Sequence, residues 1–88
     1  MRFMLVAVTT VFLTCPALAG PECTDQPRSK WLSVEEMVAR INASQYSIDV
    51  FKVTSRGCYE IYGRNKDGRR VEIYYHPITG EQVRSRAR

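Results

Sequence analysis

Few residues of this chain could perform chemistry, and the most obvious of them is its single histidine. Histidine is the side chain that ionises near neutral pH, and His76 stands directly before a proline, where a strand is predicted to end. A general base needs a substrate proton or a nucleophile within reach. No serine–histidine pattern, phosphate-binding loop or metal-ligand spacing accompanies His76. The sequence therefore predicts a protein that is not an enzyme and has no catalytic residues, metal or cofactor.

Two glutamates offer a second candidate for chemistry. Glu60 and Glu72 lie on neighbouring predicted strands, where they could approach each other across a hairpin. Alternating charges along a strand usually mark a solvated face, and Arg69 and Arg70 are close by in the sequence. We therefore expect weak, exposed ion pairs here rather than a pair of catalytic carboxyl groups.

The N-terminal residues predict export. Residues 3–13 are nearly all apolar, with Arg2 before them and the small-x-small sequence Ala17-Leu18-Ala19 after them. A positive start, a short apolar core and such an ending are typical of a secretory signal peptide, here residues 1–19. The mature protein is then expected to be periplasmic or secreted, without a membrane span.

Two other interpretations of this segment compete with a signal peptide. A membrane anchor needs about twenty apolar residues, and Pro16 followed by Gly20-Pro21 ends this run sooner. A lipoprotein would carry its lipid on Cys15, but Phe12-Leu13-Thr14 is a poor approach to a lipidated cysteine. The signal peptide accounts better for the whole segment.

Signal cleavage would leave two cysteines, Cys23 and Cys58. An even pair in a small exported protein favours a disulfide. The alternative, two free or metal-binding thiols, would need further ligands, and the chain has one histidine and no C-x-x-C sequence. In the chain-entropy model, closing a loop of this length contributes roughly 3–4 kcal/mol, which is substantial for a domain with a small core.

The elements that position these residues begin with a short helix. The chain has 88 residues, which is at most one domain, and residues 20–30 are predicted to be an extended leader. Ser33 and Glu36 form a capping-box pattern, and apolar residues follow at helical spacing: Val34, Met37, Val38 and Ile41. One amphipathic helix is therefore expected from Val34 to about residue 42 or 44.

Period-two alternation predicts a sheet after the helix. Strands are expected at about residues 46–53, with a bulge near Val50-Phe51, at 58–62 and at 71–75, and a brief last strand around Gln82 and Val83. Residues 65–68 (Asn-Lys-Asp-Gly) are typical of a hairpin loop with positive φ at Gly68. The fold class is therefore α+β: one N-terminal helix on a three- to four-stranded antiparallel meander.

The two faces of this sheet differ in composition. The strand residues expected under the helix are Tyr59, Ile61, Val71, Ile73 and Tyr75. The opposite face carries Tyr62 and Tyr74 beside Glu60, Glu72 and Arg64, and rings set among charges are typical of a protein-contact face. The alternatives are that the leader covers this face, that the tyrosines simply suit strands, or that they stack on single-stranded nucleic acid, which an exported protein seldom meets.

The C-terminal residues carry most of the excess positive charge. Cleavage after Ala19 removes Arg2, so 13 basic residues become 12 against 9 acidic ones. Arg84, Arg86 and Arg88 supply the excess. A basic tail of this kind can attract anionic lipid or polymer, or it can be a frayed, solubilising end.

Several segments together resemble the PepSY domain family. They are residues 31–36 (Trp-Leu-Ser-Val-Glu-Glu), Tyr46 with Ile48, residues 57–61 (Gly-Cys-Tyr-Glu-Ile), residues 67–74 (Asp-Gly-Arg-Arg-Val-Glu-Ile-Tyr) and residues 76–81 (His-Pro-Ile-Thr-Gly-Glu). The resemblance spans about residues 22–84, and residues 31–88 form the PepSY-like domain. It is closest to the small exported, stand-alone (PepSY_2-like) versions, which carry one cysteine before the helix and one opening the second strand. The family usually has an acidic residue where this chain has His76.

The resemblance implies a helix packed on a small antiparallel sheet and brings no catalytic residues with it. It also implies a role in restraining or regulating peptidases, because such domains occur in propeptides of thermolysin-like metallopeptidases and in membrane-associated regulatory proteins. We therefore expect an exported, non-catalytic binding module with a protein partner, such as a peptidase, and no nucleic-acid ligand. The alternative is an envelope-surface protein that binds anionic lipid or polymer through the basic C-terminal tail.

The mature protein is expected to begin at Gly20, because Ala17-Leu18-Ala19 supplies the small residues that cleavage requires. Intact mass and N-terminal sequencing of the exported protein measure this directly. Retention of Met1, or a lipid mass on Cys15, would contradict it.

Overall fold

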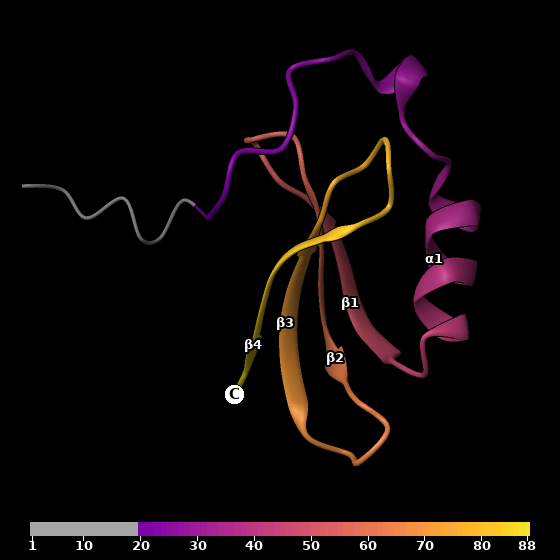
Figure 1. The fold of residues 1–88 in the computed structure, drawn as a ribbon, viewed down its shortest axis with the longest axis vertical. Helices are drawn as coiled ribbons and strands as arrows, with labels where there is room; N and C mark the ends of the chain where they lie inside the picture. The colour runs from indigo at the N-terminus through magenta and orange to yellow at the C-terminus, as the bar shows by residue number, and fades with distance from the viewer. Residues whose placement is uncertain (1–19) are drawn as a thin grey trace, which may run out of the picture.

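The computed structural model describes residues 20–88, so the predicted signal peptide at residues 1–19 lies outside the described residues. The elements are η2 (Arg28–Lys30), α1 (Val34–Ala43), β1 (Ser47–Val53), β2 (Tyr59–Arg64), β3 (Arg70–Tyr75) and β4 (Gln82–Ala87). Adjacent strands are antiparallel and their order in the sheet is β1-β2-β3-β4. This arrangement, with α1 beside a four-stranded meander (Figure 1), confirms the α+β fold.

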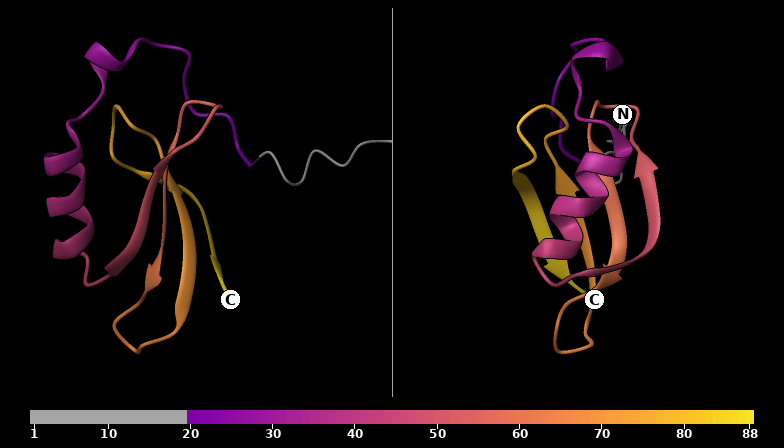
Figure 2. Two further views of the ribbon diagram at one scale, coloured as in Figure 1. Left: turned by 180° about the vertical axis from the view of Figure 1, so that it is seen from behind. Right: turned by 90° about the vertical axis from the view of Figure 1, so that its right-hand side faces the viewer.

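Helix α1 begins at the predicted capping box. The Glu36 N–H donates to Ser33 Oγ and the Ser33 N–H donates to Glu36 Oε1, both at 3.0 Å, which satisfies two backbone donors that the helix itself leaves free. Met37 and Ile41 are buried. Val34 shares their helical spacing but is 40% exposed, so it lies outside the core. Figure 2 shows α1 crossing one face of the sheet, so the buried stripe of the helix is the one that contacts the strands.

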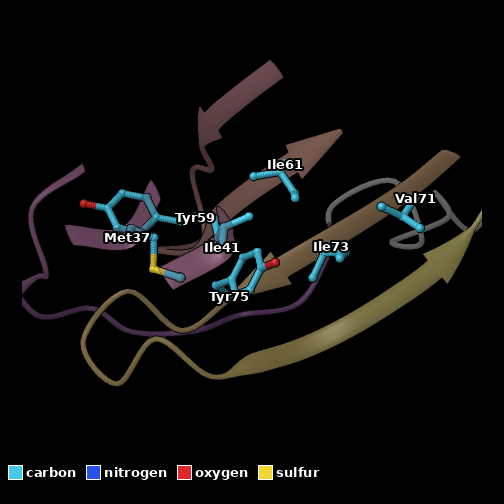
Figure 3. Close-up of a cluster of buried hydrophobic side chains, with 7 residues drawn as sticks. All are labelled: Met37, Ile41, Tyr59, Ile61, Val71, Ile73 and Tyr75. Atoms are coloured by element: carbon cyan, nitrogen blue, oxygen red, sulfur yellow. The ribbon is translucent and has the colours of Figure 1, made fainter. Parts of the chain in front are cut away.

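The core lies between α1 and this face of the sheet. Its buried side chains are Met37, Ile41, Tyr59, Ile61, Val71, Ile73 and Tyr75 (Figure 3), which include all five strand residues expected under the helix. The Tyr59 hydroxyl donates to the Leu32 carbonyl at 2.7 Å, and its ring meets Trp31 edge-on with centroids 5.2 Å apart. Tyr59 therefore links the segment before α1 to the centre of the sheet.

A β-bulge in β1 explains why the apolar pattern changes phase there. The register with β2 shifts between Ile48 and Val50, which leaves Asp49 unpaired, slightly earlier than the Val50-Phe51 position predicted. One extra residue lets Ile48 and Phe51 both pack against the core. Val50 is then turned to the other side of the sheet, where it is 46% exposed.

The C-terminal strand is longer than the sequence predicted. The brief strand predicted around Gln82 and Val83 instead continues to Ala87 and pairs with β3. The Arg88 N–H donates to the Arg70 carbonyl at 2.8 Å. Arg84 and Arg86 therefore belong to an edge strand and are not part of a frayed tail.

The disulfide between Cys23 and Cys58 is present as predicted and fastens the leader, residues 20–30, to the start of β2. The Cys23 N–H donates to the Arg56 carbonyl at 3.0 Å, and Arg56 Nη2 lies 3.2 Å from Glu22 Oε2. Gly57, at φ 80°, lets the two segments approach, because a Cβ there would overlap the Thr24 carbonyl. The leader is extended until it forms the 3₁₀ turn η2.

Removal of the disulfide is expected to destabilise the domain. The bridge joins residues 35 apart in sequence, so the double variant Cys23→Ser/Cys58→Ser should lose about 2–4 kcal/mol of unfolding free energy. Urea denaturation of residues 20–88 measures this loss. Thiol titration of the denatured, unreduced parent should find no free thiol, and two titratable thiols would contradict the bridge.

Candidate functional site

The sheet face opposite α1, here called the outer face, brings together most of the predicted contact residues. The strand register aligns Lys52, Glu60, Tyr74 and Arg84 in one row across the sheet and Val50, Tyr62, Glu72 and Arg86 in the next. These rows alternate with the core rows, as period-two geometry requires. The outer face therefore juxtaposes side chains from all four strands.

The predicted contact residues differ in exposure. Arg64 is exposed, and Tyr62 and Glu72 are half-buried. Tyr74 is 8% exposed and Glu60 only 4%. The expectation of exposed ion pairs near Arg69 and Arg70 is therefore wrong for Glu60, and Glu72 pairs instead with Arg86 while only 12% of its side chain is exposed.

The leader is responsible for much of this burial. Gly20 lies against the Tyr74 ring, so closely that a Cβ at Gly20 would be 2.9 Å from Tyr74 Cε2. The Pro21 carbonyl oxygen lies 3.3 Å from Cys58 Sγ, on the same face. The leader thus covers the end of the outer face near Tyr74 and Cys58, which we call the covered half.

Glu60, Glu72 and Tyr74 form a hydrogen-bonded cluster beneath the leader. The Tyr74 hydroxyl donates to Glu72 Oε2 at 3.1 Å, and Arg86 Nε lies 3.5 Å from Glu72 Oε1. Burial, and then the adjacent carboxylates, raise the pKa of Tyr74 to about 12, so its phenol stays neutral and donates. Among residues 20–88, Glu60 Oε2 is a buried acceptor without a hydrogen-bond partner.

The environment moves the pKa values of the two carboxyl groups in opposite directions. Burial raises the pKa of Glu60, and its hydrogen bond with Glu72 raises it further. Burial alone would raise the pKa of Glu72 too, but hydrogen bonds with Glu60 and Tyr74 and the charge of Arg86 hold it below 4.5.

Tyr62 is the centre of the remaining part of the outer face, which we call the open half. Lys52 Nζ and Arg88 Cζ each lie 5.2 Å from the centre of its ring, and in the described part of the chain neither cation forms an ion pair. A shallow hollow of about 550 Å³ spans both halves, lined by Lys52, Glu60, Tyr62, Glu72, Tyr74, Arg86, Ala87 and Arg88. Arg64 is outside the hollow, with its Nε 3.9 Å from Asp49 Oδ2.

Three of these residues, Lys52, Arg86 and Arg88, were not among the predicted contact residues. The spacing of Arg84, Arg86 and Arg88 was itself the period of a strand, and this was the signal that could have placed two of them on the face. Lys52 reaches Tyr62 from β1. Lys52 and Tyr62 are diagonal neighbours on adjacent strands, and their contact depends on the register between β1 and β2. The sequence contained no comparable signal for Lys52.

His76 has a local structural role. Its Nδ1 accepts the N–H groups of Ile78 and Thr79 at 3.2 and 3.4 Å, which holds the turn between β3 and β4. A carboxylate could accept the same two donors, so His76 can serve at the position where the resemblance led us to expect an acidic residue.

The described residues contain neither a metal-binding cluster nor a helix suited to a membrane. Within residues 20–88, no three or more histidine, cysteine, aspartate or glutamate side chains gather closely enough to hold a metal ion. Over the same range, no helix combines the length and the apolar character needed to cross a bilayer.

The unfolding free energy of the Glu60→Gln variant is expected to depend less on pH than that of its parent. Both proteins should begin at Ala17, so that residues 17–19 precede Gly20. Because the pKa of Glu60 is raised above 4.5, its protonated form stabilises the fold fully below about pH 4.5, and this contribution is lost as the pH rises through the folded-state pKa. Urea unfolding between about pH 4.5 and pH 8 should show the parent losing stability relative to Glu60→Gln. The exposed carboxylate variant Glu81→Gln is the control and should behave as the parent; a parent that gains stability relative to Glu60→Gln would contradict the assignment.

Comparisons with known proteins agree with this architecture. The family model described as PepSY_2, peptidase propeptide and YPEB domain, matches residues 3–86, nearly the whole chain. Searches of curated proteins and of solved structures found no match. With the match covering the leader, the helix and all four strands, the chain belongs to the PepSY_2 family.

Proposed function

We propose that this protein is an exported, non-catalytic binding module that contacts a protein partner through the open half of its outer face. The observation that carries the proposal is Tyr62, a half-buried ring flanked by Lys52 and Arg88 on a face that α1 does not cover. An aromatic ring with cations over it offers apolar area and hydrogen-bond donors together, the combination enriched at the centres of interfaces.

A peptidase is the partner class that the family favours. The matching family is described by its occurrence in peptidase propeptides, and domains of this kind are generally regulatory rather than catalytic. They are also typically extracellular or periplasmic, in keeping with the predicted signal peptide. The charges on the open half suit a partner surface that carries carboxylates, since Lys52 and Arg88 have no acidic partner among the described residues.

The exposed arginines of β4 support a second candidate function, binding to anionic lipid or polymer at the cell envelope. Arg84 and Arg86 project from one strand, and Arg88 follows it. Their alignment gives a short positive row rather than a flexible tail. Binding through this row would be electrostatic and would weaken strongly at high ionic strength, whereas contacts made by Tyr62 would persist.

Tyr62→Ser is the substitution that tests the proposed face. Immobilised residues 20–88 should capture a partner from the exported fraction, and Tyr62→Ser should reduce that capture about tenfold, the loss expected for a residue worth more than 1 kcal/mol at an interface. Stability should fall by only about 1 kcal/mol, because the ring loses cation–π contacts but no core packing. Quantitative mass spectrometry of the captured proteins and urea unfolding supply the two readouts.

Lys66→Ser, on the exposed loop between β2 and β3, is the matched control and should capture normally. The proposed face would be overturned if Tyr62→Ser left capture unaffected while high salt, or substitution of Arg84, Arg86 and Arg88, abolished it. That result would favour the envelope-binding candidate. Inhibition of a captured peptidase by the parent, and not by Tyr62→Ser, would identify the partner class.

A further inference from the structure

The covered half of the outer face contains a buried acceptor that nothing else in the fold satisfies. Glu60 is 4% exposed, and its Oε2 lacks a hydrogen-bond partner among residues 20–88. A buried carboxylate oxygen without a donor costs considerable free energy. Glu72 accepts from Tyr74 and pairs with Arg86, so within the described residues the Tyr74 hydroxyl and Arg86 are engaged with Glu72 rather than with Glu60.

Gly20 is placed beside this cluster. A Cβ on Gly20 would lie 3.0 Å from the Tyr74 hydroxyl oxygen. That hydroxyl donates to Glu72 Oε2, and Tyr74 is paired with Glu60 in the strand register. Since N–Cα and Cα–Cβ are each about 1.5 Å long, the Gly20 nitrogen lies no more than about 6 Å from the Tyr74 hydroxyl. The Cys23–Cys58 bridge holds the leader in this position.

Cleavage after Ala19 would change the chemistry of this nitrogen. Hydrolysis of the Ala19–Gly20 peptide bond consumes one water, leaves a carboxylate on Ala19 and frees the amino group of Gly20, which takes up a proton near neutral pH. A neutral amide with one donor thereby becomes an ammonium group with three donors and a positive charge. Glycine suits the position, because any side chain would collide with the Tyr74 ring.

We propose that Glu60, Glu72 and Tyr74 form a binding site for a primary ammonium group, and that its occupant is the α-amino group of Gly20 in the processed chain. The ammonium supplies the donor that Glu60 Oε2 lacks and offsets the negative charge of the carboxyl pair. The charged and titratable groups on the outer face around the site are Lys52, Glu60, Tyr62, Glu72, Tyr74, Arg84, Arg86 and Arg88, all from the strands or the residue after β4. Export thus completes the site and fixes the leader over the covered half, which goes beyond the proposed contact function.

The test is a comparison of N-termini combined with a change at Glu60. Four proteins are needed: residues 20–88 and residues 17–88, each with the parent sequence and with Glu60→Gln. At about pH 6.5, where an α-amino group of ordinary pKa near 8 is charged, the parent starting at Gly20 should have a folding equilibrium constant about tenfold larger than the parent starting at Ala17. In the Glu60→Gln background this ratio should be close to one.

The pH dependence and a control carboxylate distinguish the site from a general effect of length. The pKa of the Gly20 amine, followed by NMR, should be raised, so its contribution to stability is full below about pH 8 and is lost as the pH rises through the folded-state value. With Glu81→Gln, an exposed carboxylate, the tenfold ratio should remain. The proposal would be overturned if the pKa of the Gly20 amine were unshifted, or if the ratio of folding equilibrium constants were the same in the parent and in Glu60→Gln. Neither outcome depends on finding a protein partner.

Discussion

The disulfide between Cys23 and Cys58 is the constraint on which the arrangement of the outer face depends. Apart from η2, the leader has no regular structure, and within residues 20–30 none of its side chains is fully buried. The covalent bridge, together with the Cys23–Arg56 backbone hydrogen bond and the close approach allowed by Gly57, holds this segment against β2. Because the segment is held there, Gly20 covers Tyr74 and one end of the sheet is removed from solvent.

The bridge also adds to the difference in burial between the two faces of the sheet. The inner face is closed by α1 and buries tyrosine and isoleucine side chains in one cluster. Within residues 20–88 no helix lies over the outer face, and its charged residues partly neutralise one another along the strand rows. The leader converts one half of that face into a buried polar cluster. In the half around Tyr62, Lys52 and Arg88 form no ion pair within residues 20–88, which is the observation behind the proposed contact surface.

Strand β4 completes the sheet without contributing to the core. All six of its residues are exposed, so its stability rests on backbone hydrogen bonds to β3 rather than on apolar burial. Arginine side chains on such an edge also oppose pairing with a further strand of another molecule. The same residues bring Arg86 to Glu72 and Arg88 to Tyr62, so the edge strand supplies the positive groups of the outer face.

Features that depend on residues close together in the chain could be predicted from the sequence. The capping box of Ser33 and Glu36, the alternation that sends Ile61 and Ile73 inward, and the hairpin closed by Gly68 at φ 84° each involve residues within a few positions of one another. In that hairpin, Asn65 Oδ1 accepts the N–H groups of Asp67 and Arg69. The disulfide also followed from the sequence, because only two cysteines remain after the predicted cleavage site.

Three features could be seen only in the folded chain: the length of β4, the burial of Glu60, and the positions of Lys52 and Arg88 over the Tyr62 ring. A strand held by backbone hydrogen bonds can lack any apolar pattern of its own, so β4 had too weak a sequence signal. The burial of Glu60 depends on where the disulfide-linked leader lies. The placement of Lys52 and Arg88 over Tyr62 depends on the register of all four strands. These are long-range juxtapositions, whose geometry is set by how the elements pack and which local residue patterns do not specify.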